Sequence, residues 1–169
     1  MGRTKSVTEW ESGLPETPCG RGSKFENTEV IRKFIPHVIE SRGIKSVADV
    51  GCGDQNWIHD CLPAPGSCGI NYAGYDIMPR RNDVVTFDVT REVLPCRFDL
   101  VLCVYVLNHV YPDQAERALR LIKESRSTFL LMSYSDADQY SLDGAGELVD
   151  SCFHKKTARH TWRYGLWKI

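Results

Sequence analysis

The feature that most constrains the fold is a glycine-containing turn directly after a short apolar segment. The segment Lys45 to Val50 has the composition of a β-strand, runs into Gly51-Cys52-Gly53-Asp54, and is followed by a brief helical stretch through Trp57 and Ile58. Glycines at such a turn let the backbone bend sharply and approach a bound nucleotide, because no Cβ stands in the way. A strand, a glycine turn and a helix in this order predict the start of an α/β unit.

The same alternation of strands and helices continues along the chain. Apolar periodicity predicts helices over 27–40, where Pro36 should kink or delay the helix, and over 113–125, where Asp113 and Glu116 are placed as a capping box. Further strands are predicted over 72–77, 84–87, 100–107 and 128–134, and a closing hairpin over 151–157 and 161–168. The pattern therefore predicts a doubly wound, mainly parallel sheet with a C-terminal antiparallel hairpin. The run 100–107 is apolar throughout, which is typical of a central strand covered on both faces.

Size and composition limit the domain organisation and the class of partner. A chain of 169 residues with 42% hydrophobic residues predicts one domain over 1–169, with residues 1–26 as a possible lid segment. The net charge of -1 disfavours, without excluding, a nucleic-acid partner, because phosphate binding normally needs an excess of Lys and Arg. The seven cysteines contain no C-x-x-C pair, so no metal site is expected. The N-terminus lacks an apolar signal region and no apolar stretch is long enough to span a bilayer, so we expect no membrane association and a cytoplasmic location.

A carboxylate after the next predicted strand supports a nucleotide site at the glycine turn. Asp76 follows Gly51 by about 25 residues, at the position where a carboxylate can accept both hydroxyl hydrogens of a ribose. The dinucleotide pattern G-x-G-x-x-G fails, because Asn56 stands at its third glycine. A plain strand-to-helix turn is the alternative reading of the two glycines alone.

The string Val47-Ala48-Asp49-Val50-Gly51-Cys52-Gly53-Asp54 resembles the glycine motif of class I S-adenosylmethionine (SAM)-dependent methyltransferases, which share a Rossmann-like fold. The resemblance implies SAM as the cofactor, Asp76 at its ribose and Asp88 at the adenine amino group. The family motif often has a third glycine, which is Gln55 here. The residues that the resemblance places at the cofactor are Asp49, Gly51, Cys52, Gly53, Asp76, Ile77, Asp88 and Val104.

Other segments resemble small bacterial and phage methyltransferase-like proteins without a well-defined substrate. The segments that carry this resemblance are 13–16, 20–23, 51–57, 72–79 and 166–168. This resemblance covers most of the chain and implies a methyltransferase (EC 2.1.1.-) without specifying its acceptor.

The end of the predicted fourth strand is similar to the acceptor-side motif of small-molecule methyltransferases. There the apolar run is followed by Asn108 and His109, which the resemblance places beside the transferring methyl group. An imidazole at that position can act as a general base, and Asn108 can donate to the acceptor. Equally, His109 can cap the strand end and Asn108 can form a turn.

A run of cations and aromatic residues from His154 to Tyr164 is open to two readings. It could bind phosphate or stack a base, or it could be the solvated face of a hairpin, since alternate residues of an edge strand point outward. The predicted function is therefore methyl transfer from SAM to an unidentified small-molecule acceptor, with the oligomeric state left open. The alternative from a different class is a SAM-binding regulatory or interaction protein without catalytic activity, and a nicotinamide oxidoreductase is disfavoured by the missing third glycine.

Overall fold

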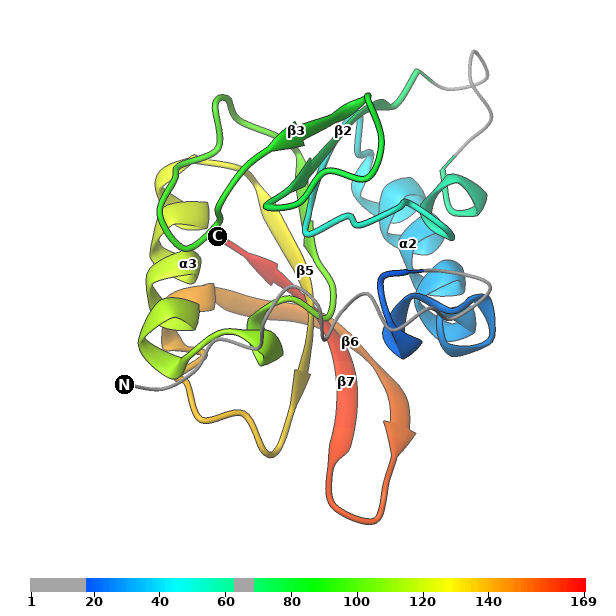
Figure 1. Cartoon of the computed structure of the whole chain (residues 1–169), viewed down its shortest axis with the longest axis vertical. Coiled ribbons are helices and arrows are strands. Elements are labelled where there is room, and N and C mark those ends of the chain that lie inside the picture. The colour runs from blue at the N-terminus through cyan, green and yellow to red at the C-terminus, as the bar shows by residue number, and fades with distance from the viewer. Residues whose placement is uncertain (1–17, 63–68) are drawn as a thin grey trace.

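The computed structural model describes residues 18–62 and 69–169, whose strands form a seven-stranded sheet in the order β3-β2-β1-β4-β5-β7-β6 (Figure 1). The pairs from β3 to β5 are parallel, whereas β7 is antiparallel to β5 and β6 is antiparallel to β7. The predicted parallel sheet with a C-terminal antiparallel hairpin is therefore confirmed. The strands are β1 (Ser46–Val50), β2 (Asn71–Asp76), β3 (Val84–Thr86), β4 (Leu100–Cys103), β5 (Phe129–Ser135), β6 (Glu147–Lys156) and β7 (Thr161–Lys168).

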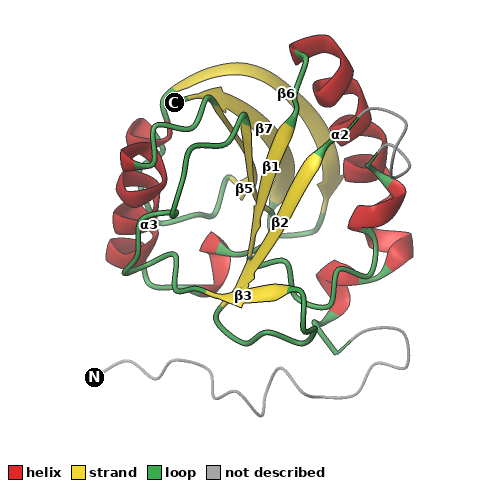
Figure 2. Cartoon of the chain, turned by 90° about the horizontal axis from the view of Figure 1, so that it is seen from above, coloured by secondary structure: helices red, strands yellow, loops and turns green. Residues whose placement is uncertain are grey.

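Two α-helices cover opposite faces of the sheet, as Figure 2 shows. One face carries α2 (Glu29–Arg42), and the other carries α3 (Pro112–Glu124). Each helix contributes an apolar stripe to its own buried cluster, and the four residues of β4 between the clusters are all buried. The short 3₁₀ helices are η1 (Arg21–Ser23), η2 (Phe25–Asn27), η3 (Ile58–Asp60), η4 (Leu107–His109) and η5 (Asp143–Ala145).

The helix boundaries differ from the predictions for local reasons. Helix α2 begins at Glu29 and continues through Pro36, because its buried apolar stripe holds it to the sheet although proline removes one helical hydrogen bond. The predicted capping box of Asp113 and Glu116 is wrong. Pro112 occupies the first turn of α3, and the backbone N–H of Tyr111 donates to Gln114 Oε1 at 3.1 Å.

The edge strand β6 begins earlier than predicted. The predicted strand begins at residue 151, but β6 starts at Glu147, which pairs with Lys168 of β7. The register of this pair shifts twice, between Leu148 and Asp150 and between Phe153 and Lys155. These irregularities obscure the period-2 pattern on which the prediction of the strand rested.

Candidate functional site

The carboxyl ends of β1 and β2 bring the glycine turn and Asp76 together. The backbone N–H groups of Gly51 and Cys52 donate to the Tyr75 carbonyl, at 2.7 and 3.2 Å. The next N–H, that of Gly53, donates to Asp76 Oδ2 at 2.9 Å. Hydrogen bonds from backbone N–H groups therefore join the turn to the end of β2. Asp76 lies beside the glycine turn, as their spacing in the sequence predicts.

The Asp76 carboxylate is held in a fixed orientation with part of its hydrogen-bonding capacity left over. Its Oδ1 accepts from the Met78 N–H at 2.8 Å, while its Oδ2 accepts from the turn. A carboxylate has about four lone-pair sites, so each oxygen can accept one further hydrogen bond. Neighbouring Ile77 is 62% exposed, which leaves an apolar side chain at the surface beside the carboxylate.

Both glycines of the turn adopt backbone angles that favour glycine, and the protein itself fills the space next to them. The φ angles are 74° at Gly51 and 58° at Gly53. A Cβ at Gly51 would lie 2.3 Å from Val106 Cγ2, and one at Gly53 would lie 2.7 Å from Cys19 Sγ. A side chain at either position would therefore collide with other described residues of the chain.

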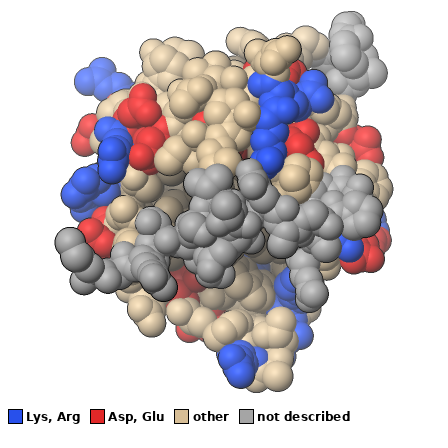
Figure 3. Space-filling model, in the orientation of Figure 1, with Lys and Arg blue, Asp and Glu red and all other residues tan. Residues whose placement is uncertain are grey.

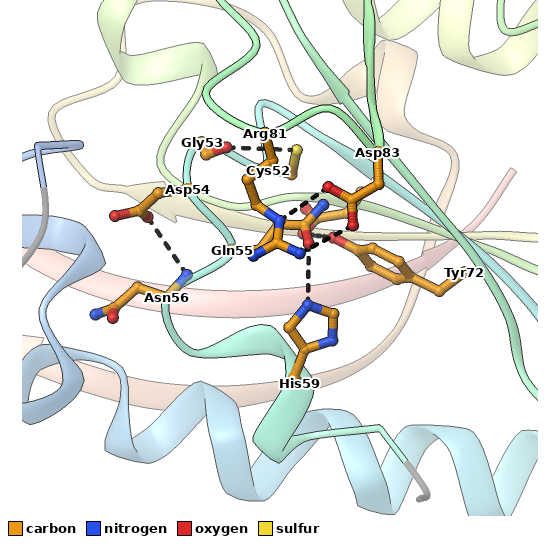
Figure 4. A network of polar contacts seen from close by, with 10 residues as sticks. Cys52, Gly53, Asp54, Gln55, Asn56, His59, Tyr72, Arg81 and Asp83 are labelled. Atoms are coloured by element: carbon orange, nitrogen blue, oxygen red, sulfur yellow. Dashed lines mark hydrogen bonds and ion pairs between the residues drawn. The ribbon is translucent and has the colours of Figure 1, made fainter. Parts of the chain in front are cut away.

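Gln55 replaces the expected third glycine while keeping the glycine backbone conformation. Its φ angle is 60°, and its side chain lies over Gly74 of β2, where an added Cβ would come within 2.6 Å of Nε2. Its Oε1 lies 2.9 Å from His59 Nε2, a contact drawn in Figure 4. The turn therefore has the shape of a glycine-rich turn, with a glutamine amide packed beneath it.

Asp49 is a buried carboxyl group that accepts a hydrogen bond from a tyrosine. It is 3% exposed, and the Tyr72 hydroxyl donates to its Oδ2 at 2.9 Å. Burial, together with a smaller contribution from the charge of Asp76 and against the lowering effect of the Tyr72 hydrogen bond, raises the pKa of Asp49 to about 7. No salt bridge reaches either carboxylate within residues 18–62 and 69–169. The site therefore combines two carboxyl groups with no cationic partner of their own.

Cys52 is placed at this site but is not poised as a nucleophile. Burial, followed by the charges of Asp49 and Asp76, raises the pKa of its thiol far above the ordinary value. A nucleophilic cysteine needs a lowered pKa instead. Cys52 contributes packing and backbone geometry to the turn.

Asp88 follows β3 as predicted, but its carboxylate already has local partners. Oδ1 accepts from both the N–H and the hydroxyl of Thr90, at 2.9 and 2.7 Å, and Oδ2 lies 3.3 Å from Arg91 Nε. These contacts fix the turn after β3. A contact of Asp88 with adenine stays a prediction.

The strand predicted over 100–107 ends at Cys103. Val104 is buried on the α2 side, and Tyr105 then takes a φ angle of 58°. Its N–H donates to Ser133 Oγ at 2.7 Å rather than to a neighbouring strand. The left-handed residue breaks the ladder, and apolar composition could not reveal this break because the side chains remain partly or fully buried.

Asn108 and His109 lie in η4, directly after this break. Asn108 is half-buried and His109 is exposed, and their side chains meet with Asn108 Nδ2 3.1 Å from His109 Nε2. With the amide oriented this way, Nε2 accepts and the ring proton lies on Nδ1. Asn108 Oδ1 is buried and has no hydrogen-bond partner in the part of the chain that the structure describes.

The described part of the predicted lid, residues 18–26, contacts both the glycine turn and Tyr105 after β4. Cys19 lies against Gly53, Gly22 lies against the Tyr105 ring, and Asn56 Nδ2 donates to the Ser23 carbonyl at 3.1 Å. The rest of the predicted lid, residues 1–17, lies outside the described residues. A lid role for residues 1–26 stays a prediction.

Sequence reasoning missed several residues that the structure places around the site. These are Tyr72, His59 and the side chain of Gln55, which support the glycine turn. His154 and Tyr164, which belong to the run that the sequence analysis singled out, pack near Tyr105. Tyr72 and Gly74 are two residues apart on β2, so they share a face, but which face they occupy depends on register that composition does not encode.

Other classes of site find little support in the structure. No helix among the described residues is long and apolar enough to cross a membrane. Within the same residues, no three His, Cys, Asp or Glu side chains are grouped as metal ligands. Figure 3 shows basic and acidic side chains interspersed on the face it draws, which agrees with the near-neutral net charge.

A protein-family model described as a methyltransferase domain matches residues 25–166. A search of curated proteins gave no match.

Several solved structures share the fold at low sequence identity. N-methyltransferase NodS from Bradyrhizobium japonicum, in complex with S-adenosylhomocysteine, has a TM-score of 0.71 and 14% identity over 95% of each chain. Magnesium protoporphyrin IX methyltransferase from Synechocystis, with bound SAM, has a TM-score of 0.61 and 12% identity over 95% of this chain and 90% of the other. A 1,6-didemethyltoxoflavin N1-methyltransferase from Burkholderia thailandensis has a TM-score of 0.59 and 16% identity, covering 87% of this chain and 81% of the other.

Proposed function

The chain belongs to the methyltransferase domain family, and on this premise we propose that it transfers the methyl group of SAM to a small-molecule acceptor. The resemblance to class I SAM-dependent methyltransferases is confirmed, and SAM is the cofactor of this fold. The observation that carries the proposal is the meeting of Asp49, the glycine turn and Asp76 at the same edge of the sheet as the end of β4. The solved neighbours named above include methyltransferases whose names specify small molecules, which supports the class of acceptor.

The chemistry of the residues fits SAM. A ribose offers two hydroxyl donors, and Asp76 has unused acceptor capacity on both carboxylate oxygens. SAM carries positive charge on its sulfonium and amino groups, and Asp49 is a buried carboxyl group that no salt bridge from another described residue reaches. Exposed Ile77 offers apolar surface beside Asp76, suited to a planar base. Val104, Gly51, Cys52 and Gly53 complete the proposed cofactor site, with Asp88 proposed at the adenine.

The bound cofactor supplies an electrophilic methyl group, and the protein's main contribution is to hold the acceptor in line with it. Asp76 and the glycine turn fix the cofactor side of the site. Tyr105, Asn108 and His109, after β4, provide the acceptor side. His109 can take up the acceptor proton through Nδ1 only if Asn108 rotates its amide so that Oδ1 accepts from Nε2–H. Without that rotation, the Asn108–His109 pair positions the acceptor.

The cofactor half of the proposal is tested with Asp76→Ala and a matched surface control. Loss of charge-assisted hydrogen bonds, worth about 1.5–3 kcal/mol each, should weaken binding of S-adenosylhomocysteine at least tenfold. Asp113→Ala removes an exposed carboxylate from α3 and should leave the affinity unchanged. Calorimetric titration of both variants measures the difference. Unchanged affinity in Asp76→Ala contradicts the cofactor site.

The acceptor half is tested with methyl-labelled SAM in a cell extract. Methyl transfer to a small molecule puts label into the ultrafiltrate after macromolecules are removed. Label only in the protein or nucleic-acid fraction contradicts a small-molecule acceptor. Cofactor binding without any transfer favours the non-catalytic alternative.

A further inference from the structure

Four aromatic rings from three separate segments meet beside the end of β4. Tyr105 lies with its ring centroid 6.0 Å from His154 of β6, 5.8 Å from Trp162 of β7 and 6.0 Å from Tyr164 of β7. The rings of His154 and Tyr164 are 4.9 Å apart. We refer to Tyr105, His154, Trp162 and Tyr164 as the aromatic cluster.

The aromatic cluster lies at the carboxyl edge of the sheet. Trp162 pairs with Ser135, the last residue of β5, and Tyr164 pairs with Ser133, whose hydroxyl accepts from the Tyr105 N–H. The residue after Tyr105 is Val106, the side chain that packs on Gly51 of the glycine turn. The aromatic cluster therefore adjoins the proposed cofactor site on the side of β4, where open α/β sheets bind ligands. In Figure 1 the hairpin of β6 and β7 extends from the sheet in the direction in which β5 ends.

Two irregularities of the backbone bring these rings together. Tyr105 holds a left-handed conformation, which is unfavourable for a residue with a side chain. His154 is the extra residue of the register shift between Phe153, which pairs with Arg163, and Lys155, which pairs with Trp162. Strained residues and β-bulges concentrate at ligand sites, where they redirect a side chain. Here the left-handed backbone at Tyr105 and the bulge at His154 each direct a ring into the aromatic cluster.

The ring nitrogens of His154 distinguish it within the aromatic cluster. The hydroxyl groups of Tyr105 and Tyr164 lie 2.9 Å apart and satisfy each other. In contrast, both ring nitrogens of His154 are buried and have no hydrogen-bond partner within residues 18–62 and 69–169. Burial, and then the nearby charge of Lys155, lowers the pKa of His154 to about 4, so the imidazole is neutral at neutral pH. A neutral imidazole offers one acceptor and one donor, and a buried polar group without a partner is a cost that a ligand can remove.

We infer that the aromatic cluster forms the acceptor site, and that the methyl acceptor is a planar aromatic or heteroaromatic molecule whose O–H or N–H donates to His154. Trp162 is half-buried, so its ring is accessible to an incoming aromatic molecule. The Trp162 side chain must move for that molecule to reach the His154 imidazole. The inference rests on the proposed function and adds the class of acceptor to it. A nucleobase within RNA would use similar contacts, but the near-neutral charge favours the free molecule.

The test compares planar acceptors with saturated ones on three variants and the wild type. The probes are 2-naphthol and 4-hydroxyquinoline against cyclohexanol and piperidine, each added with S-adenosylhomocysteine for binding and with labelled SAM for turnover. His154→Phe keeps the ring and loses the nitrogens, and Trp162→Leu removes the rim ring. Phe153→Ala is the matched control, because Phe153 neighbours His154 but is 54% exposed.

We expect the planar probes to bind and be methylated in preference to the saturated ones. His154→Phe and Trp162→Leu should each weaken binding of the planar probes about tenfold and leave the affinity for S-adenosylhomocysteine unchanged, whereas Phe153→Ala should change neither. Melting temperatures show whether His154→Phe or Trp162→Leu has lost its fold. If one of them has, probe binding by the other tests the inference. Any of four results overturns the inference. These are equal use of saturated and planar probes, no binding of planar probes by wild type, unchanged binding of planar probes by the folded variants, and label found in RNA. Failure of wild type to bind S-adenosylhomocysteine overturns the proposed function instead.

Discussion

The two halves of the site are built in different ways. The cofactor half, at the ends of β1 and β2, is a continuous turn fixed by backbone hydrogen bonds to Tyr75 and Asp76. The acceptor half, after β4 and on β6 and β7, is made of side chains that lie far apart in the sequence and meet through a left-handed residue and a bulge. The first half is acidic, and the second is aromatic and neutral. Backbone geometry fixes the part of the site that we propose binds the constant cofactor, and side chains form the part that we propose binds the acceptor.

The two halves touch where Val106 packs on Gly51, and breaking this contact should have the largest effect. Gly51→Ala places a Cβ in a left-handed conformation and 2.3 Å from Val106 Cγ2. We expect it to lower the free energy of unfolding by about 2–4 kcal/mol and to weaken cofactor binding with it. Denaturant unfolding and calorimetry on the same preparation measure both effects.

A matched glycine separates strain from collision in this experiment. Gly43 has a φ angle of 63°, but a Cβ there meets nothing within 4 Å, so Gly43→Ala should cost only about 1–2 kcal/mol. Adding Val106→Ala to Gly51→Ala should recover part of the loss. If Gly51→Ala is no worse than Gly43→Ala, the contact between the two halves carries no energy and the halves are independent.

The acidity of the cofactor half predicts a stability effect of intermediate size. The pKa of Asp49 is about 7 in the folded protein against an ordinary value of 3.8, so the folded state binds the proton more tightly than the unfolded state. The resulting penalty is absent below pH 4, grows as the pH rises and is complete above pH 7. Asp49→Asn keeps an acceptor for Tyr72 and should stabilise the cofactor-free protein by roughly 1–3 kcal/mol at pH 8, and by less at pH 5.

The same substitution should weaken SAM binding, because it removes the negative charge proposed to face the cofactor. Unfolding curves at pH 5 and pH 8, with and without SAM, measure both changes. Asp113→Asn, at an exposed position of α3, is the control and should show no dependence of this kind. A destabilised variant at pH 8 would mean that the charge of Asp49 is compensated within the folded chain.

The contrast between the halves also explains what the sequence could predict. The parallel sheet with its antiparallel hairpin, the glycine turn and the position of Asp76 follow from local composition and spacing, because a parallel α/β unit repeats the same local pattern. The end of β4 at Cys103 and the bulge at His154 did not follow, because both depend on hydrogen bonds to distant residues such as Ser133. Sequence patterns report periodicity within a segment, and they do not report which side chain of another segment interrupts it.

The smallest predicted effect concerns Gln55, where the chain departs from the usual glycine. Gln55→Gly relieves the left-handed strain, by about 1 kcal/mol, and removes a buried amide nitrogen without a partner. It also removes the hydrogen bond to His59 and the packing over Gly74, which together cost a similar amount. We therefore expect the free energy of unfolding to stay within about 1 kcal/mol of wild type and the affinity for S-adenosylhomocysteine to change less than about threefold.

Gln55→Ala is the matched variant, because it loses the same side-chain contacts and keeps the strain. It should be less stable than Gln55→Gly by about 1–2 kcal/mol, measured by denaturant unfolding at pH 7. A large loss of cofactor affinity in Gln55→Gly with unchanged stability would show that the glutamine amide contacts the cofactor directly. The backbone of the turn would then not be sufficient for binding, and the cofactor half would depend on side chains as the acceptor half does.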